Sequence, residues 1–223
     1  LLNPSPIYNA DVSIAGSSEN GNVNYYNSLN FFDQDGLIEN SGIQKYIFRS
    51  NLDFKLSDKL KAGLRINYSR IKQDNGVVGY SGLLGILPTQ LIYNDDGSFN
   101  GTNEVVGNPF NNPVATSQLD IDETTTSNLL GTVYLEYNPI ENLIIRSTFN
   151  PDITNSKRNE FTSSQRPDLP TTLSSARVST ISSFGWNNEN TIQYSGVFGE
   201  NHNYTLLGGA SFQKTTTETS LAQ

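Results

Sequence analysis

Two acidic stretches, Asp33–Gly36 (DQDG) and Asn94–Ser98 (NDDGS), contain the residue types best suited to holding a metal ion. Each resembles the start of a calcium-binding loop, which supplies carboxylate and amide oxygens at alternate positions. Such a loop also requires a glycine at its sixth position and a bidentate glutamate at its twelfth, and neither stretch has this spacing. Asp-Gly pairs are typical of tight turns. The sequence therefore predicts two turns here and no metal site.

The residues that could act as general bases or nucleophiles do not form a catalytic arrangement. His202 is the only histidine and lies in an expected tight turn with no serine partner nearby, and the chain has no cysteine. A general base must lie within hydrogen-bond reach of the proton that it removes. Glu136 and Glu189 are isolated carboxylates that the sequence gives no reason to pair. We predict that the chain is not an enzyme and holds no cofactor.

Much of the chain shows a two-residue alternation of apolar and polar side chains, which is typical of β-strands. The clearest example is Lys45–Arg70, where two alternating runs flank the short turn Ser57–Lys59. The apolar positions are Tyr46, Phe48, Leu52, Phe54 and Leu56 in the first run, and Leu60, Ala62, Leu64, Ile66 and Tyr68 in the second. The polar positions include most of the charged residues. This pattern predicts a long antiparallel hairpin with one apolar and one polar face.

The same alternation recurs along the rest of the chain and predicts an all-β protein of about eight strands. The further strands are expected at Tyr8–Ile14, Val23–Phe31, Leu129–Tyr137, Leu143–Phe149, Phe184–Phe198 and Tyr204–Phe212. Aromatic residues stand near several strand ends, as in the interfacial girdles of membrane barrels. The examples are Phe31, Tyr46, Tyr68 and Tyr137.

The connections between the expected strands alternate in length. The short ones are Gly16–Gly21, Ser57–Lys59, Asn138–Glu141 and Gly199–Asn203, and the long ones are Asp33–Gly42, Lys72–Glu123 and Pro151–Ser175. Outer-membrane β-barrels have short periplasmic turns and long extracellular loops. The pattern therefore predicts antiparallel up-and-down strands of a transmembrane β-barrel, with residues 72–123 as a long extracellular loop.

The strand order predicts that residues 1–223 are only part of a larger barrel. The first strand runs into a short turn and the last one leaves a short turn, so both termini are expected on the long-loop side. A complete barrel with an even number of strands has both termini on the short-turn side. Two alternatives remain open at this point. One is a complete small eight-stranded outer-membrane barrel, and the other is a soluble β-sandwich that binds carbohydrate or acts as an adhesin.

Composition narrows the class of protein further. The chain has 223 residues, a formal net charge of −8, and 35% hydrophobic residues. The negative charge and the lack of a Lys/Arg cluster argue against a nucleic-acid partner. No run of 18 apolar residues is present, which excludes a transmembrane helix within this sequence. The 11 tyrosines and 11 phenylalanines favour an ordered chain over a disordered one.

The order of motifs resembles the early barrel of SusC/RagA-type TonB-dependent transporters. The resemblance begins with Tyr8–Ser69, which contains "YYNSLNFFDQDGLIENS" and "RSNLDFKLSDKLKAGLRINYS". It continues through "LPTQLIYNDDGSF" (Leu87–Phe99), "NPFNNPVA" (Asn108–Ala115), "LLGTVYLEYNPIENLIIRSTF" (Leu129–Phe149) and "WNNENTIQY" (Trp186–Tyr194). The matches keep the order and spacing of the family's motifs and span nearly the whole chain.

This resemblance implies a function and a set of partners. The family's barrel has roughly 22 strands and holds a plug, and neither the plug nor its TonB box is found in this sequence. The resemblance implies import of bulky nutrients, such as oligosaccharides or peptides, across the outer membrane of a Gram-negative bacterium. It also implies contact with outer-membrane lipid, energy supplied by TonB through the plug region, and a SusD-like surface lipoprotein as a lid.

Candidate binding residues fall into two groups. Polar strand residues are expected to face the lumen, where they line it against substrate or plug, or form a solvated, mutually paired wall. These are Arg49, Asp53, Arg65 and Arg146. Aromatic residues in the longest loop are expected either to stack on sugar rings or contact the lid protein, or to pack the loop on itself. These are Tyr80, Tyr93, Phe99 and Phe110.

Overall fold

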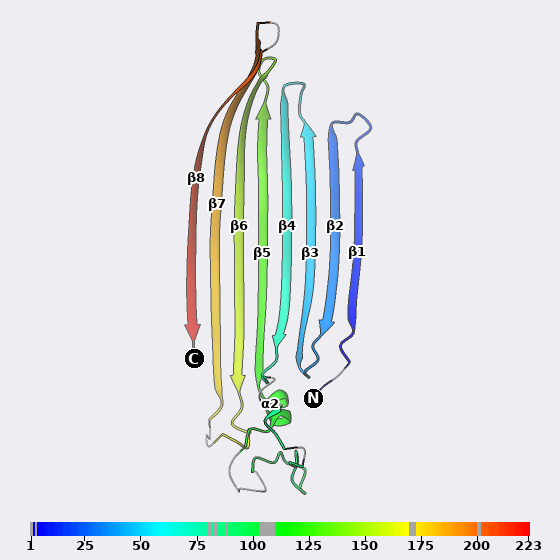
Figure 1. Ribbon diagram of the computed structural model, residues 1–223, viewed down its shortest axis with the longest axis vertical. Helices are drawn as coiled ribbons and strands as arrows, with labels where there is room; N and C mark the ends of the chain where they lie inside the picture. Colours follow the sequence, from blue (N-terminus) through cyan, green and yellow to red (C-terminus); the bar gives the residue numbers. More distant parts are fainter. Residues whose placement is uncertain are drawn as a thin grey trace.

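Eight strands form one antiparallel sheet in which every strand pairs with its neighbours in sequence (Figure 1). The computed structural model describes residues 2, 4–79, 82, 84–87, 89–102, 110–169, 173–199 and 202–223. The strands are β1 (Ile7–Ser17), β2 (Val23–Asp35), β3 (Ser41–Lys55), β4 (Leu60–Asn75), β5 (Ile121–Tyr137), β6 (Leu143–Thr162), β7 (Ser175–Phe198) and β8 (His202–Ala222). A short helix, α2 (Pro113–Leu119), precedes β5. The prediction of an all-β, up-and-down antiparallel fold is confirmed.

The sheet is open, because β1 and β8 lie at its opposite edges and do not pair with each other. This excludes the complete eight-stranded barrel, which requires that pairing to close. It also excludes the β-sandwich, because the described strands make one sheet and not two packed ones. Both alternatives are therefore wrong. Each edge strand has a row of backbone N–H and C=O groups with no strand beside it, and open edges of this kind are not tolerated in lipid.

The two ends of the sheet differ in their connections (Figure 1). The turns after β1, β3, β5 and β7 lie at one end and are short. The described parts of the connections after β4 (within residues 76–120) and after β6 (within residues 163–174) lie at the other end, together with α2 and both chain termini. The two longest connections therefore lie at the same end of the strands, as the sequence predicts.

The connection between β2 and β3 is shorter than the sequence predicts. The polar run Asp33–Gly42 indicates a long loop, but β2 continues to Asp35 and β3 begins at Ser41. The backbone N–H of Gly36 donates to the carbonyl oxygen of Ser41 at 2.7 Å. Asn40 adopts a φ of 58°, in the left-handed region that asparagine enters more readily than most residues. The chain therefore reverses within residues 36–40.

Strands β5 to β8 are much longer than their apolar segments. Strand β6 has 20 residues and spans about 66 Å at roughly 3.3 Å per residue, whereas the apolar band of a membrane barrel is about 25 Å tall. The additional residues are mostly polar on both faces, so they show no regular alternation for sequence analysis to detect. They include Ile121–Asn128, Asn155–Thr162, Ser175–Ser183 and Gln213–Ser220. These strands extend well beyond the apolar band towards the long connections.

One face of the sheet, here named the apolar face, is the side that carries Phe48. Residues that pair directly across neighbouring strands share a face, and the pairing places a row of apolar side chains across β1 to β7. The row comprises Val12, Leu29, Phe48, Tyr68, Leu129, Ile153 and Phe184. These side chains are exposed or only half-buried, and Val12 is 72% exposed.

In the part of the chain that the structure describes, no layer of buried hydrophobic side chains packs against the apolar face. Among the described residues, the buried hydrophobic side chains are Val78, Val114 and Ala115, all in the connection between β4 and β5. An exposed apolar surface of this extent marks an interaction with a membrane or another protein. Within the same described part of the chain, no helix has the length and apolarity to cross a membrane.

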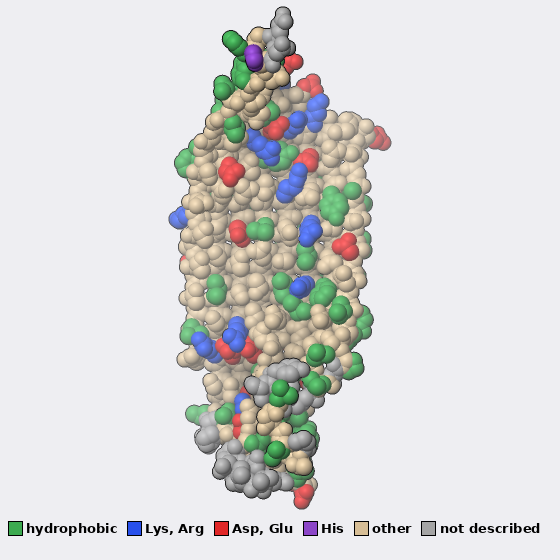
Figure 2. Space-filling view, viewed as in Figure 1, with side chains coloured by type: hydrophobic (Ala, Val, Ile, Leu, Met, Phe, Trp, Pro, Cys, Tyr) green, Lys and Arg blue, Asp and Glu red, His purple; other side chains and the backbone are tan. Residues whose placement is uncertain are grey.

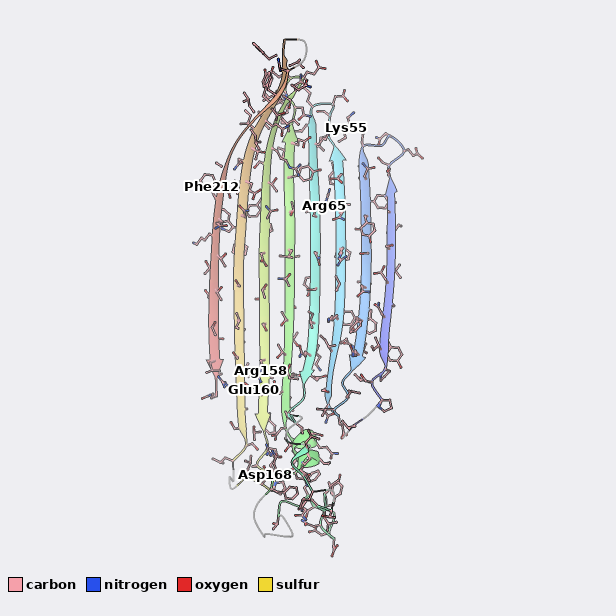
Figure 3. The ribbon with its side chains drawn as sticks, in the orientation of Figure 1. Lys55, Arg65, Arg158, Glu160, Asp168 and Phe212 are labelled. Atoms are coloured by element: carbon pink, nitrogen blue, oxygen red, sulfur yellow. The ribbon has the colours of Figure 1, made fainter. Side chains whose placement is uncertain are left out.

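The opposite side of the sheet, here named the polar face, carries most of the charged strand residues. Figure 2 shows Lys, Arg, Asp and Glu side chains distributed along the height of the sheet over a largely polar surface. Figure 3 places Lys55 and Arg65 towards the short-turn end, and Arg158 and Glu160 towards the long connections. The strands therefore separate lipid-compatible and water-compatible side chains onto two faces, as the Lys45–Arg70 pattern predicts.

Candidate functional site

The polar face holds a hydrogen-bonded cluster that spans β3, β4 and β5 near the short turns. Arg65 Nη2 donates to both carboxylate oxygens of Asp53, at 2.7 and 2.8 Å. The hydroxyl of Tyr134 donates to Asp53 Oδ1 at 2.7 Å. Asp53 pairs with Gly63 across β3 and β4, and Gly63 pairs with Tyr134 across β4 and β5. Tyr134 therefore reaches across an entire strand to bind Asp53.

Gly63 makes this reach possible. A Cβ atom added at this glycine would lie 2.5 Å from Cζ of Tyr134, far inside van der Waals contact. The tyrosine ring thus occupies the space that any other side chain would fill. Arg65 also donates to the carbonyl oxygens of Leu52 and Leu64, and these hydrogen bonds hold its guanidinium against the polar face of the sheet.

A second part of the cluster joins β4, β5 and β6. The guanidinium carbon of Arg146 lies 4.1 Å from the centroid of the Tyr134 ring, a cation–π distance. Arg146 Nη1 is 3.6 Å from Glu136 Oε2, and Lys61 Nζ is 3.3 Å from Glu136 Oε1. The structure thus brings Asp53, Arg65 and Arg146 together around Tyr134.

Outside the sheet, the connection between β4 and β5 is organised by Asn112, whose side chain is fully buried. Its Oδ1 accepts hydrogen bonds from the backbone N–H groups of Val114 and Ala115, which makes it the N-cap of α2. Its Nδ2 donates to the carbonyl oxygens of Ile92 and Asn100, both at 2.8 Å. One amide side chain therefore ties together three parts of the connection.

Replacing Asn112 with alanine is expected to loosen this connection and leave the strands intact. The change removes an N-cap and takes one side-chain donor from each of the carbonyl oxygens of Ile92 and Asn100, at a local cost of about 2 kcal/mol. Hydrogen exchange of the amides in residues 112–120 should accelerate, while exchange in β5 should not. Asn112→Asp retains the capping oxygen and should give an intermediate rate. Unchanged protection in Asn112→Ala would contradict this role.

The end of α2 is anchored to the neighbouring connections. Asn40 Nδ2, from the β2–β3 connection, donates to the carbonyl oxygen of Ser117 at 2.7 Å. Asp120 Oδ1 accepts from the backbone N–H of Ser163, which follows β6. The long connection is therefore fixed on both sides to the connections that follow β2 and β6.

Arg166 completes this anchor from the connection after β6. Its guanidinium, which is largely buried, lies 2.9 Å from Asp120 Oδ2 and 2.5 Å from Asp168 Oδ2. Burial lowers the pKa of Arg166, but the hydrogen bonds with Asp168 and Asp120 outweigh burial and leave the pKa above its ordinary value. The guanidinium is thus charged at any physiological pH and forms ion pairs with the carboxylates of Asp120 and Asp168.

The loop aromatics predicted as binding residues are only partly brought together. Tyr93 and Phe99 stack at 5.3 Å between ring centroids and form an isolated β-bridge around the turn between them. Phe110 lies beside a separate hollow of 200 Å³ lined by Gly82, Leu87 and other residues of the connection. Tyr80 lies outside the described residues. The stacked pair packs the loop on itself and still leaves Tyr93 46% exposed.

The acidic stretch Asn94–Ser98 forms a turn. The backbone N–H and the hydroxyl of Ser98 both donate to Asp96 Oδ1, at 2.9 and 2.6 Å. These two hydrogen bonds hold the pKa of Asp96 below its ordinary value. Gly97 adopts a φ of 84°, which a glycine tolerates at no steric cost.

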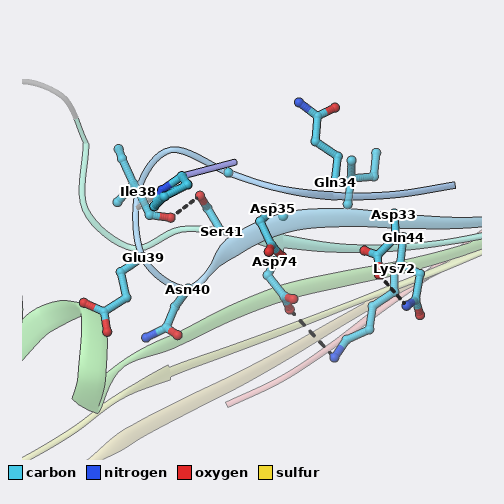
Figure 4. Close-up of a pocket in the computed structure, with 14 residues that line it drawn as sticks. Asp33, Gln34, Asp35, Ile38, Glu39, Asn40, Ser41, Gln44, Lys72 and Asp74 are labelled. Atoms are coloured by element: carbon cyan, nitrogen blue, oxygen red, sulfur yellow. Dashed lines mark hydrogen bonds and ion pairs between the residues drawn. The ribbon is translucent and has the colours of Figure 1, made fainter. Parts of the chain in front are cut away.

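The acidic stretch Asp33–Gly36 borders a cavity of 520 Å³ at the end of β2 (Figure 4). Lys72 Nζ lies 3.8 Å from Asp74 Oδ1 in this cavity, and Gln44 Nε2 lies 3.5 Å from Asp33 Oδ2. Over the described residues, no group of three metal-ligating side chains converges on one point.

No family model matches the sequence. Among curated proteins, TonB-dependent receptor P26 of Formosa agariphila is 60% identical over 220 residues, which cover 98% of this chain and 22% of the receptor. TonB-dependent receptor P3 of the same organism is 30% identical over 234 residues, which cover 97% of this chain and 22% of that receptor. The chain thus spans about a fifth of the length of the curated relatives that it matches.

Solved structures show the same fold. The RagAB peptide transporter superposes with a TM-score of 0.79 over 97% of this chain and 26% of its own, at 19% identity. The ferripyoverdine receptor of the outer membrane of Pseudomonas aeruginosa superposes with a TM-score of 0.62 over 96% of this chain and 27% of its own, at 13% identity. The chain therefore belongs to the TonB-dependent receptors, in which it corresponds to a stretch of the β-barrel.

Proposed function

We propose that the chain is part of the barrel wall of a SusC-like transporter that imports oligosaccharides or peptides across the outer membrane. The observation that carries this proposal is the exposed apolar row across β1 to β7, backed by a charged polar face. In a closed barrel, the apolar face meets lipid and the polar face lines an aqueous lumen. The open edges at β1 and β8 would pair with further strands of the same receptor.

In this proposal the long connections stand on the extracellular side. The described parts of the connections 76–120 and 163–174 are joined to one another through Asn112, Asp120 and Arg166. Such an anchored loop offers a fixed surface to a SusD-like lipoprotein lid or to a solute. The exposed Tyr93, with Phe99 and Phe110, and Tyr80 remain the proposed contact residues. Arg49, Asp53, Arg65 and Arg146 remain the proposed lumen residues.

The mechanism assigned to the receptor is transport without catalysis. A solute held at the extracellular loops would enter the lumen when TonB rearranges the plug region. The cluster around Tyr134 would then act as a stiff, charged wall against which solute or plug moves, because its donors and acceptors pair with one another. The superposition on the RagAB peptide transporter and the 60% identity with a TonB-dependent receptor both support a transport role.

Deletion of the gene for the full-length receptor in its source organism tests this function. The deletion strain should lose growth on one class of oligosaccharide or peptide as sole carbon source, and the intact gene should restore it. A tagged receptor purified from the same cells should retain a lipid-anchored surface lipoprotein, identified by mass spectrometry. Undiminished growth of the deletion strain on every oligosaccharide and peptide offered would overturn the proposal.

A further inference from the structure

The polar face of β3 and β4 is strongly basic, although the whole chain has a net charge of −8. Alternation and pairing place five basic side chains and one acidic side chain of these two strands on that face. The basic ones are Lys45, Arg49, Lys55, Lys61 and Arg65, and the acidic one is Asp53. An anion that approached this part of the sheet would meet a net positive surface.

Most of these basic groups already have a partner. Arg65 is paired with Asp53, Lys61 with Glu136, and Lys55 with Asp58. Lys45 Nζ lies 5.3 Å from the centroid of the Phe32 ring. Within the described part of the chain, Arg49 stands apart, since none of the ion pairs or hydrogen bonds found there involves its guanidinium.

Arg49 borders a hollow of 200 Å³ on the sheet between β3, β4 and β5. Asn51 and Asn67 line the same hollow, and Asn67 is the direct cross-strand partner of Arg49. Neither asparagine side chain makes a hydrogen bond within the described residues, so both amide groups have free N–H donors. Thr132, on the β5 side, already donates its hydroxyl proton to Asn150 Oδ1 at 2.8 Å.

Arg65 lies at the same hollow but is not available to a ligand. Its Nη2 is held by both carboxylate oxygens of Asp53, and its Nη1 donates to two backbone carbonyl oxygens. The hollow therefore combines one free guanidinium with two free amide donors and a neutralised second arginine. Planar guanidinium groups bind the oxygens of carboxylate, sulfate and phosphate in paired hydrogen bonds.

We propose that Arg49, Asn51 and Asn67 form an oxyanion subsite on the lumen wall that binds an acidic group of the transported solute. The subsite rests on the proposed transport function, since it assigns the polar face to the lumen. It narrows the solute to one that carries carboxylate, sulfate or phosphate ester groups. A carboxylate from another segment of the receptor could accept hydrogen bonds from the same donors. A crystal structure of the full-length receptor distinguishes that carboxylate from an acidic group of the solute.

The first test is a crystal structure of the full-length receptor soaked with selenate, whose selenium scatters anomalously. The inference predicts an anomalous peak within hydrogen-bond distance of Arg49 and Asn67, and no peak there in Arg49→Gln. Lys55→Gln, on the same strand and face, is the matched control and should keep the peak. An empty hollow, or Arg49 paired with a carboxylate of the receptor itself, would overturn the subsite.

The second test measures uptake of the solute that the deletion strain fails to use. Loss of a charge-assisted hydrogen bond should raise KM for uptake by about ten- to a hundredfold in Arg49→Gln. KM for uptake should rise less in Arg49→Lys than in Arg49→Gln, because lysine keeps the positive charge. KM should stay at the wild-type value in Lys55→Gln. If selenate binds but Arg49→Gln leaves uptake unchanged, the bound selenate is an adventitious ion only, and the inference is overturned. The same conclusion follows if the transported solute has no acidic group. A deletion strain without a growth defect would instead refute the transport function, while the selenate result still decides whether Arg49 binds oxyanions.

Discussion

Arginine in place of Val133 is expected to remove most of the full-length receptor from the outer membrane. Val133 lies in the middle of the apolar part of β5, on the apolar face, and is 49% exposed. A charged arginine on the lipid face at the bilayer midplane costs about 2–4 kcal/mol. This corresponds to a loss of roughly 30- to 1,000-fold in the equilibrium for insertion.

Thr148→Arg is the matched control for this substitution. Val133 pairs with Phe149 on β6, so Thr148 lies at nearly the same depth but on the polar face. Its cross-strand neighbour on β7 is Glu189, which gives the new arginine a carboxylate nearby. We expect the amount of Thr148→Arg receptor in the outer membrane to remain close to wild type.

The measurement for both variants is the quantity of heat-modifiable receptor in isolated outer membranes. Equal amounts of the Val133→Arg and Thr148→Arg receptors would show that the two faces do not differ in environment. That result would contradict the assignment of the apolar face to lipid. A loss confined to Val133→Arg would support it.

Alanine in place of Gly63 is expected to destabilise the barrel wall through Tyr134. The added methyl group would lie 2.5 Å from Cζ of the tyrosine, so the ring must move. Its movement breaks the hydrogen bond to Asp53 and the contact with Arg146. Overpacking together with a lost hydrogen bond costs about 2–4 kcal/mol.

The temperature at which the folded band of the receptor converts to the unfolded band on gels measures this effect. Gly208→Ala, on β8, is the control, because its nearest neighbour would be Ile192 Cγ2 at an ordinary 3.7 Å. Adding Tyr134→Ala to Gly63→Ala should remove most of the further cost of the glycine substitution. Additive losses in that double variant would show that Gly63 and Tyr134 are not coupled.

The alternation of the Lys45–Arg70 hairpin was sufficient to predict its strands, because lipid and water impose opposite requirements on successive residues. The same signal is absent where strands leave the apolar band. Apart from Phe161, residues 155–162 (NSKRNEFT) are polar on both faces, and their strand is set by pairing with neighbours that sequence analysis does not place. On β7, Asn188 and Asn190 also share the apolar face, where Asn188 donates to the carbonyl oxygen of Thr148.

The clusters around functional residues were harder to predict than the strands. Arg65 and Asp53 could be placed on one face from spacing alone, but not joined, because register between strands decides which side chains meet. The sequence pattern places Tyr134 in a strand but indicates no role for it, since only the absence of a side chain at Gly63 allows its ring to reach Asp53. For Asn112 the sequence offers one indication, because an asparagine followed by a proline is typical of the start of a helix.

The central claim is that the apolar face of this sheet meets lipid while the polar face meets water. It is tested most directly by single spin labels placed at each position from 129 to 137 of β5 in the full-length receptor, reconstituted in bilayers. The chain has no cysteine, so every label site within it can be introduced singly. Collision with oxygen should peak at the odd positions 129, 133, 135 and 137, and collision with a water-soluble nickel complex should peak at the even positions. Equal accessibility to the nickel complex at odd and even positions would contradict the claim.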